Sequence, residues 1–599
     1  MHRLALIAFA APAALLAQST GGPRGAYHFA QIVLPGPDTT ARNLGGSISF
    51  DDGGGVRIRA RMAAGANAAT DVAVDGEWRL SASGAAAIVT NPAHPDSTME
   101  VRFGDGAQVL IASPDGGDGT GYEMFVAVRA PAGGRSNADL VGLYSGAYLS
   151  LAEGTPAGLA TAFVDLTADG AGRFTQSALI GHAAAIDDVN RAESTASSTY
   201  SFRGDGAGVA QFAAPSDVLS GPRELLVSEG GDFLIAYSLD EDRRDILFAV
   251  RRDADAASFQ FHGVFRIVEL LAENGFVFHP EQARMGAAEG AVRTDSAGIA
   301  LVAEKIRMDG RRTTLTTVNR YLIGAASWFG PEIDGTRHNF ALSAGGDVFV
   351  GAQVAASGAL TLEHGIFAGI RTVSPPVSSG PSIAALGIAN VTTPGFPALS
   401  VAPGSLASIS GTRLATDSAT APPGETATAL AGVRVLLNGE ALPLRMVSAG
   451  RIDVEIPAAS APGRAEIQVE SAGTLSNSGE VEVQAASPTL AAAIADGRGG
   501  AVAAHADGAL LSNDRPAVPG ETVSLYLTGL GSQATEIQVL FAGVAGEVTY
   551  AGPAPGYPGI DQINVTLPPD LQARGSVAVA LGTPGAFTDL ADLPVAASN

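Results

Sequence analysis

Short runs that alternate apolar and polar side chains, separated by glycine-rich turns, make up most of the chain. In Val56-Arg-Ile-Arg-Ala-Arg-Met62 every second residue is apolar, and the residues between are arginines. Because successive side chains of a strand point to opposite faces, this pattern predicts a strand with one buried and one solvated face. Asp-Gly and Gly-Gly pairs lie between such runs and supply the positive φ of tight hairpins. The pattern therefore predicts antiparallel meanders.

Three stretches of the N-terminal part carry the same signals in the same order: a Gly-x-aromatic opening, an aspartate turn, and a closing strand from phenylalanine to arginine. The openings are Gly25-Ala-Tyr27, Gly142-Leu-Tyr144 and Gly263-Val-Phe265; the turns include Asp52-Gly-Gly-Gly55 and Asp169-Gly-Ala-Gly172; the closing strands are Phe125-Val-Ala-Val-Arg129, Phe248-Ala-Val-Arg-Arg252 and Phe367-Ala-Gly-Ile-Arg371. Roughly 110 residues per stretch allow about eight strands, which predicts three repeated meander modules, each a small barrel or a compact sandwich. Opening and closing strands are neighbours if a sheet closes on itself. This favours a barrel of lipocalin or avidin type, although neither family's signature is present.

The last third of the chain contains a duplicated unit. Pro403-Gly404 and Pro519-Gly520 each begin a strand of alternating apolar and hydroxyl residues. The matched positions include Ser408 with Ser524, Thr412 with Thr528, and Leu414 with Leu530, and Arg451-Ile-Asp-Val-Glu-Ile-Pro457 returns as Gln562-Ile-Asn-Val-Thr-Leu-Pro568. A Pro-Gly turn followed by such a strand is typical of a half-buried strand at the surface of a β-sandwich. We expect two successive sandwiches here.

These C-terminal motifs resemble a known family. Pro403-Gly-Ser-Leu-x-Ser-Ile-x-Gly-Thr-x-Leu, Pro519-Gly-Glu-x-Val-x-Leu-Tyr-x-Thr-Gly-Leu-Gly and Tyr550-Ala-Gly-Pro-Ala-Pro-Gly-Tyr-Pro-Gly-Ile-Asp-Gln-Ile-Asn-Val565 are similar to the uncharacterised C-terminal domain family of secreted Solibacter-type acidobacterial proteins. The resemblance covers roughly residues 384–599. It implies tandem immunoglobulin-like modules of the IPT/TIG kind and export, and it leaves the activity open. The family commonly has Gln-Ile-Asn-Phe-Gln-Val-Pro where this chain has Arg451-Ile-Asp-Val-Glu-Ile-Pro457.

The signals together predict an all-β chain with the following order. We expect a signal peptide at 1–18, meander modules at 19–136, 137–256 and 257–373, a Pro/Ser linker at 374–383, and Ig-like domains at 384–487 and 488–599. His2-Arg3 and the apolar run after them are typical of a secretory signal, so we expect a secreted, cell-surface or periplasmic protein. Paired prolines near residue 375 cannot extend a sheet ladder and favour a spacer.

Composition narrows the function classes. The 599 residues include 75 Gly and 34 Pro and only 6% aromatic residues, which favours many short strands over helical bundles. A net charge of −24 argues against nucleic acid and anionic membrane surfaces as partners, because both need clustered Lys and Arg. The absence of cysteine excludes disulfides, thiolate metal sites and thiol catalysis. No later run approaches the 18 apolar residues of a transmembrane helix.

Two acidic stretches are weak candidates for calcium. Asp115 and Asp118 lie in a Gly-rich stretch, and Asp240 and Asp242 lie close to Asp245. Clustered carboxylates offer the hard oxygens that calcium needs, but neither stretch has the alternating spacing of an EF-hand loop. Solvated hairpin tips are the alternative, because Asp and Gly favour turns for backbone reasons.

One aromatic cluster is a weak candidate for ligand binding. Trp328 and Phe329 meet a turn that carries Glu332, and exposed rings can stack on sugars. The alternative is that both rings belong to the core. The sequence has no His-Glu-x-x-His and no Gly-x-Ser-x-Gly motif, so we predict no catalytic residues, no cofactor and no metal site beyond the calcium candidates.

The sequence thus favours an exported, non-enzymatic binding or adhesion scaffold. Three meander modules would present a surface toward an extracellular polysaccharide or a cell-surface protein, and two Ig-like modules would act as a stalk or docking unit. A secreted hydrolase or a small-ligand carrier built on the N-terminal modules is the alternative, since a barrel mouth is a common place for a small ligand. Whether the three modules are separate barrels or one fused assembly is open.

Overall fold

A computed structural model gives the architecture of the chain, and it is built almost entirely of strands. It describes residues 22–36, 40–65, 68–81, 83–84, 86–91, 94–114, 121–152, 154, 158–183, 186–191, 197–203, 206–213, 219–240, 243–252, 261–274, 284–294, 299–308, 311–322, 327–329, 336–355, 362–372, 379–392, 398–422, 425, 427–492, 500–584 and 586–597. The helices among these are the short 3-10 turns Asp105–Ala107, Asn137–Asp139 and Gly531–Glu536. The prediction of an all-β protein is confirmed.

The first unit is a closed barrel, barrel 1, in which each strand pairs with the next. Its strands are β1 (Gly25–Leu34), β2 (Arg42–Phe50), β3 (Gly55–Ala64), β4 (Thr70–Leu80), β5 (Ala86–Asn91), β6 (His94–Phe103), β7 (Val109–Ala112) and β8 (Tyr122–Arg129). β1 pairs antiparallel with β8, which closes the ring. A closed sheet has no free edge, which removes a site of strand-to-strand aggregation.

The second unit, barrel 2, forms a similar ring. Its strands are β9 (Val141–Ala152), β10 (Leu159–Asp169), β11 (Arg173–Ala183), β12 (Ile186–Arg191), β13 (Ser197–Phe202), β14 (Ala207–Phe212), β15 (Gly221–Val227), β16 (Phe233–Tyr237) and β17 (Arg243–Arg251). The ring closes where β17 pairs with β9, and the pairing of β10 with β11 completes it. β12 lies outside the ring and pairs with β11.

The third unit, barrel 3, closes through its first and last strands. It contains β18 (Gly263–Asn274), β19 (Arg284–Thr294), β20 (Ile299–Met308), β21 (Arg311–Leu322), β22 (Ser327–Phe329), β23 (Thr336–Leu342), β24 (Val348–Ala355) and β25 (Leu362–Arg371). β18 pairs with both β19 and β25, and β20 pairs with β21. In all three units the opening and closing strands are therefore neighbours, as a barrel requires and as the sequence predicts.

Two units of two sheets each complete the chain. Sandwich 1 has one sheet of β26 (Ser382–Asn390), β28 (Leu406–Thr412), β33 (Arg451–Glu455), β32 (Leu444–Val447) and β29 (Ala419–Thr420), and one of β27 (Ser400–Val401), β36 (Gly479–Val483), β34 (Gly463–Ser471), β30 (Val433–Leu437), β31 (Glu440–Ala441) and β35 (Thr474–Leu475). Sandwich 2 has one sheet of β37 (Thr489–Leu490), β38 (Ala503–Ala504), β39 (Thr522–Thr528), β43 (Asp561–Thr566) and β42 (Glu547–Pro553), opposite β40 (Gln538–Phe541), β41 (Val544–Ala545), β44 (Gly575–Thr583) and β45 (Ala586–Val595). Each sandwich encloses its own apolar core.

An arginine at the end of each closing strand covers the glycine that opens the barrel. Cross-strand pairing places Tyr27 opposite Arg129 in barrel 1 and Phe265 opposite Arg371 in barrel 3. The guanidinium carbon lies 5.1 Å from the Tyr27 ring centre and 4.8 Å from the Phe265 ring centre, which allows cation–π attraction. Gly263 has a φ of 120°, and a Cβ there would come within 2.8 Å of the Arg371 guanidinium. The Gly-x-aromatic opening thus leaves room for the closing arginine.

The aspartate turns of barrels 1 and 2 have the same geometry, with one change to the expected alignment. Asp169 Oδ1 accepts hydrogen bonds from the amides two and four residues later, at 2.7 and 2.9 Å. In barrel 1 the residue that does this is Asp51, at 2.9 and 2.7 Å, and not Asp52 as the Asp-Gly pattern indicates. In both turns one carboxylate oxygen accepts from the amides two and four residues later, so Asp51 is the counterpart of Asp169.

A sixth apolar core lies between the barrels. The interiors of barrels 1, 2 and 3 are separate clusters, but one further cluster joins outward-facing side chains of all three. It includes Ile32, Met124, Val126, Leu149, Ile235, Phe248, Leu270, Val350 and Ile366. Seven consecutive residues of β8 are buried, and so are seven consecutive residues of β17, because both faces of these strands are covered. We call this cluster the inter-barrel core; it makes the three barrels one fused block.

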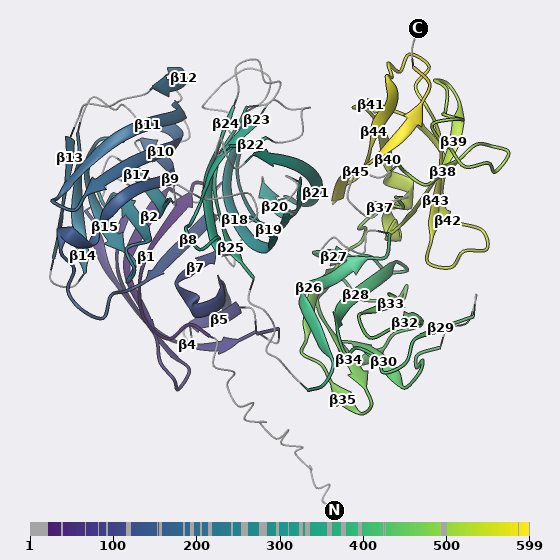
Figure 1. Cartoon of the computed structure of the whole chain (residues 1–599), viewed down its shortest axis with the longest axis horizontal. Helices are drawn as coiled ribbons and strands as arrows, with labels where there is room; N and C mark the ends of the chain where they lie inside the picture. Colours follow the sequence, from purple (N-terminus) through teal and green to yellow (C-terminus); the bar gives the residue numbers. More distant parts are fainter. Residues whose placement is uncertain are drawn as a thin grey trace, which may run out of the picture.

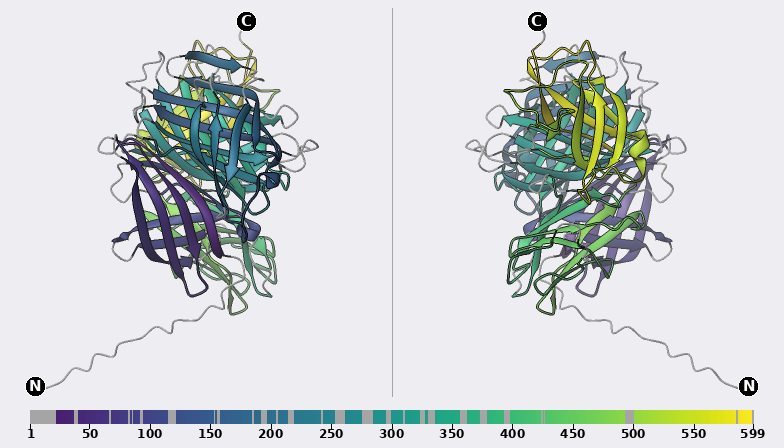
Figure 2. Two further views of the ribbon diagram at one scale, coloured as in Figure 1. Left: turned by 90° about the vertical axis from the view of Figure 1, so that its left-hand side faces the viewer. Right: turned by 90° about the vertical axis from the view of Figure 1, so that its right-hand side faces the viewer.

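The sandwiches pack against this block rather than extend away from it. Figure 1 shows barrels 2 and 3 side by side with barrel 1 below them; sandwich 2 lies on the other side of barrel 3, and sandwich 1 lies below sandwich 2. Both side views in Figure 2 show the same close grouping. β45 pairs in parallel with β21 from Thr314 to Thr317, so the last strand of the chain joins the wall of barrel 3. The predicted signal peptide and the first half of the predicted linker, 374–378, lie outside the described residues, and the end of the predicted linker is already part of β26.

Removing a side chain from the inter-barrel core should cost as much stability as removing one from inside a barrel. Leu149 and Leu225 are both fully buried, the first between barrels and the second inside barrel 2. We expect Leu149→Ala and Leu225→Ala each to lower the free energy of unfolding by about 2 to 5 kcal/mol, measured by denaturant titration. A Leu149→Ala protein with unchanged stability would mean that the barrels do not depend on one another.

Candidate functional site

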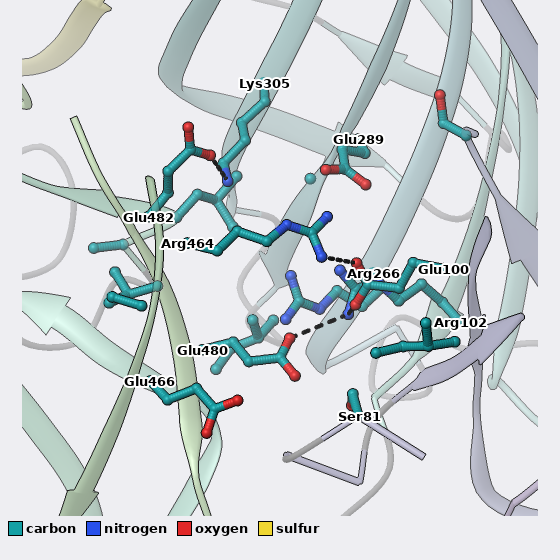
Figure 3. A pocket seen from close by; sticks show the side chains of 18 of the residues that line it. Ser81, Glu100, Arg102, Arg266, Glu289, Lys305, Arg464, Glu466, Glu480 and Glu482 are labelled. Atoms are coloured by element: carbon teal, nitrogen blue, oxygen red, sulfur yellow. Dashed lines mark hydrogen bonds and ion pairs between the residues drawn. The ribbon is translucent and has the colours of Figure 1, made fainter. Parts of the chain in front are cut away.

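A polar cavity of about 320 Å³ lies where barrel 1, barrel 3 and sandwich 1 meet. We call it the junction cavity (Figure 3). Five basic and five acidic side chains line it: Arg79, Arg102, Arg266, Lys305, Arg464, Glu100, Glu289, Glu466, Glu480 and Glu482. The charges of the wall therefore balance.

Strand alternation brings these side chains together. On β6, Val101 and Phe103 fill the interior of barrel 1, so Glu100 and Arg102 point outward. β36 repeats this arrangement: its valines enter the core of sandwich 1, and its glutamates face the barrels. From barrel 3, outward positions of β18, β19 and β20 complete the wall. The cavity thus forms from the solvated faces of three separate units.

Ion pairs across the unit boundaries hold the junction together. Arg102 lies 2.6 Å from Glu100 on its own strand and 3.7 Å from Glu480 of sandwich 1. Arg464 of sandwich 1 reaches back to Glu100 at 2.9 Å. Lys305 of barrel 3 pairs with Glu482 at 2.5 Å. Because the side chains of Arg102 and Glu100 are each only 12% exposed, solvent screens their pair weakly.

Arg266 differs from Arg102, Lys305 and Arg464, the cations of the cavity that form ion pairs. Arg266 forms no ion pair with the described residues, and its Nε atom has no hydrogen-bond partner among them. Arg79 forms no ion pair with the described residues either, but it is exposed.

Burial and the neighbouring Arg102 lower the pKa of Arg266 to about 10, so it remains charged at neutral pH. Glu100, Glu480 and Glu289 stabilise its charge from a distance, but a buried N–H donor without an acceptor is costly, and an anionic or hydroxyl-bearing ligand would relieve that cost.

Glu289 is the matching acidic group on the neighbouring strand. Burial alone would raise the pKa of Glu289, but Arg102, Lys305, Arg464 and Arg266 outweigh it and hold this pKa below its usual value. Glu289 is therefore ionised at neutral pH. The cavity offers strong hydrogen-bond donors and strong acceptors close together, which suits a ligand that both donates and accepts, such as a polyol.

A second group of ionisable side chains lies inside barrel 3. Glu269 and Glu304 occupy inward positions, two residues along from Ile267 and Val302 of the barrel interior, and are 4% and 8% exposed. β19 lies between their strands; its Gly290 pairs with Glu304, and a Cβ there would come within 2.9 Å of the Glu304 side chain. Burial raises the pKa of Glu304 to about 7, although its hydrogen bond with Glu269 acts in the opposite direction. The two carboxyl groups share an apolar interior.

The calcium and aromatic candidates lie mostly outside the described residues. Asp115, Asp118, Asp242 and Glu332 are not described, and for Trp328 and Phe329 only the backbone of β22 is. Asp240 is described: its amide donates to Ser238 Oγ at 3.0 Å, and its carbonyl accepts from Arg244.

Asp245, which the sequence groups with these calcium candidates, already has protein partners. Its carboxylate lies 2.6 Å from Arg223 and accepts a hydrogen bond from Tyr148 at 2.9 Å. A carboxylate engaged in this way is not free to bind calcium. Among the described residues, no group of three or more His, Asp or Glu side chains could hold a metal ion.

Sequence reasoning did not find the junction cavity. Its charged residues come from positions that range from Arg79 to Glu482, and none belongs to a motif. The one local signal is a pair of like or opposite charges at alternate positions of a strand, such as Glu480 with Glu482. Such pairs are equally typical of solvated strand faces. They indicate a cavity only once it is known which units dock against each other.

Comparisons with known proteins give no close relative. No protein-family profile matches the chain, and no curated protein matches it significantly. A protein of unknown function of the DUF3598 family from Nostoc punctiforme is 10% identical over 39% of this chain and 96% of its own, with a TM-score of 0.14. Transferrin binding protein B of Neisseria meningitidis is 9% identical over 59% of this chain and 77% of its own, with a TM-score of 0.18. The plexin A4 extracellular region is 8% identical over 93% and 80%, with a TM-score of 0.15.

With TM-scores this low, these similarities indicate neither the fold nor the function of the present chain. The described part of the chain contains no helix that is both long and apolar enough to cross a membrane.

Removing Arg102 should weaken the docking of sandwich 1. The Arg102→Ala change removes the cation that Glu100 and Glu480 share. Because Glu100 keeps Arg464, we expect a loss below the range of about 3 to 5 kcal/mol that is typical of breaking a fully buried pair. Arg434 offers a control, because its pair with Glu470 is half exposed and should contribute less than about 1 kcal/mol. Thermal unfolding of both variants measures the difference, and equal midpoints would contradict the role of the junction.

The raised pKa of Glu304 predicts that the protein is less stable at neutral than at mildly acidic pH. The pKa of Glu304 is raised from 4.5 to about 7 in the folded protein, so the stabilisation is complete below pH 4.5 and is lost as the pH rises through about 7. A shift of this size corresponds to at most about 3 to 4 kcal/mol. We expect Glu304→Gln to abolish most of the loss of stability between pH 5 and pH 8 in urea titrations. Glu289→Gln is the control, since the pKa of Glu289 is lowered; if both variants kept the wild-type pH slope, Glu304 would not be its source.

Proposed function

We propose that the protein is an exported, non-enzymatic binding scaffold that takes a small polar molecule, or the end of an extracellular glycan, into the junction cavity. The proposal is carried by Arg266, which lines a charge-balanced cavity, forms no ion pair with the described residues and has an Nε atom without a hydrogen-bond partner among them. A sugar hydroxyl can donate to Glu289 or Glu480 and accept from Arg266. A ligand rich in hydroxyl groups would thus satisfy both signs of the wall without a net charge of its own.

The wider architecture fits a scaffold of this kind. In this proposal the three barrels are copies of one module, supported by the recurring Gly-x-aromatic opening and closing arginine. The two sandwiches are Ig-like copies, supported by their matching Pro-Gly turns: Gly404 and Gly520 have φ values of 83° and 85°. Membership of the acidobacterial C-terminal family, export and cell-surface location belong to the same proposal and rest on the sequence resemblance and the N-terminal signal.

The carboxyl pair of barrel 3 favours a second candidate function, a secreted hydrolase. Paired carboxyl groups with one raised pKa are what glycoside hydrolysis needs, and Glu304 has a pKa of about 7. Against this, both carboxyl groups are almost fully buried in an interior rich in phenylalanine. Turnover on a polysaccharide panel that is lost in Glu304→Gln would favour the hydrolase and contradict the scaffold.

Binding to the cavity should depend on Arg266. We expect isothermal titration with a panel of neutral and carboxylated monosaccharides to find at least one that binds, and Arg266→Ala to weaken it roughly tenfold, as expected for one charge-assisted hydrogen bond. Arg293→Ala is the matched control, because Arg293 is an exposed arginine of the same barrel outside the cavity. Native mass spectra of the full chain would detect a ligand retained from purification. Binding that is unchanged in Arg266→Ala would place the ligand elsewhere.

A further inference from the structure

The outward face of one sheet of sandwich 2 is lined by uncharged polar and aromatic side chains. Ile563 and Val565 of β43 enter the core, so Gln562 and Asn564 point away from it. Cross-strand pairing places Tyr550 and Ser524 on either side of Asn564, and Tyr526 beside Gln562. We call these five residues the amide–tyrosine face: Ser524, Tyr526, Tyr550, Gln562 and Asn564. In the right-hand view of Figure 2 the strands of this unit lie in front, with the barrels behind them.

Hydrogen bonds fix the polar groups of this face. Gln562 Nε2 donates to Asn564 Oδ1 at 2.7 Å and to Ser524 Oγ at 3.3 Å. Ser524 Oγ donates to the same Asn564 oxygen at 2.9 Å. Asn564 Nδ2 makes no hydrogen bond with the described residues, so it remains free to donate. Because these hydrogen bonds already fix Ser524, Gln562 and Asn564, their side chains lose little conformational entropy when a ligand binds.

The Tyr550 ring is also held in place, although it is 40% exposed. Its hydroxyl donates to the Pro553 carbonyl at 2.8 Å. The ring lies beside Gly552, where a Cβ would come within 3.1 Å of the hydroxyl oxygen and 3.4 Å of the ring. The ring therefore lies along the sheet, which leaves a flat apolar surface open to solvent.

The first copy of the duplicated unit provides an internal comparison. At the positions of Gln562 and Asn564 it has Arg451 and Asp453, which pair with each other at 2.8 Å. Ser408, the counterpart of Ser524, is fully buried, whereas Ser524 is partly exposed. In a chain with a net charge of −24, sandwich 2 thus has an open, uncharged face where sandwich 1 has a charged and partly covered one.

We propose that the amide–tyrosine face binds a neutral, hydroxyl-rich polysaccharide chain. The exposed Tyr550 ring provides a surface for the apolar face of a sugar ring, and the amides of Gln562 and Asn564 match hydroxyl groups that both donate and accept. An uncharged ligand meets no penalty from the excess negative charge of the protein beyond the loss of its own hydration. This site is separate from the junction cavity and does not depend on it.

Affinity electrophoresis of the full chain tests the proposal. The probes are native gels that contain hydroxyethylcellulose, xyloglucan or dextran, with carboxymethylcellulose as the charged comparison. We expect at least one neutral polysaccharide to retard the wild-type protein, and Tyr550→Ala to weaken the retardation roughly tenfold, because an exposed aromatic anchor typically dominates such contacts. The double change Gln562→Arg and Asn564→Asp, which copies residues that sandwich 1 accommodates, should do the same without unfolding the protein.

Leu475→Ala is the matched control, since Leu475 is 52% exposed on sandwich 1, and it should migrate as the wild type does. The proposal is overturned if no neutral polysaccharide retards the wild type, or if retardation survives both Tyr550→Ala and the double change. It is equally overturned if light scattering finds a dimer that these variants abolish, because the face would then bind a second copy. Arg266→Ala should bind polysaccharide normally, so the two sites succeed or fail separately.

Discussion

The burial of both faces of the strands that open and close each barrel is the constraint on which the rest of the structure depends. One face of β8 fills barrel 1, and the other packs against the neighbouring barrels. At about 25 cal/mol per Å² of apolar surface, exposing that second face would be strongly unfavourable. The barrels therefore fold as neighbours, and this fixed arrangement holds barrels 1 and 3 in the orientation that leaves the junction cavity beneath them.

Different kinds of interaction hold different interfaces of the assembly together. Apolar contacts join barrel to barrel, whereas ion pairs such as Lys305 with Glu482 join barrels to sandwich 1. A polar interface tolerates a cavity that an apolar core would not, because its groups remain hydrogen-bonded or hydrated. A strand pairing adds a third kind of contact, since β45 of sandwich 2 extends the wall of barrel 3. Together these contacts place binding groups of distant sequence on one compact body.

Local periodicity was enough to predict the strands, the hairpins and the pairing of first with last strands. The runs Phe125-Val-Ala-Val and Ile246-Leu-Phe-Ala-Val also lack alternation, which is the sequence signal of burial on both faces, and they mark the inter-barrel core. The junction cavity had no such signal, because Arg102, Arg266 and Glu480 are distant in sequence and come together only when the units dock. The sequence did not predict the amide–tyrosine face, because the motif around Gln562 and Asn564 indicates only a repeat of an earlier strand, and it is the register of β42 against β43 that places Tyr550 beside them.

Hydrogen exchange monitored by mass spectrometry at increasing denaturant tests the shared core most directly. The account predicts that β8, β17 and β25 lose protection together, at one denaturant concentration, because each contributes to the inter-barrel core. Full exchange of one barrel while the strands of the other two stay protected would contradict it.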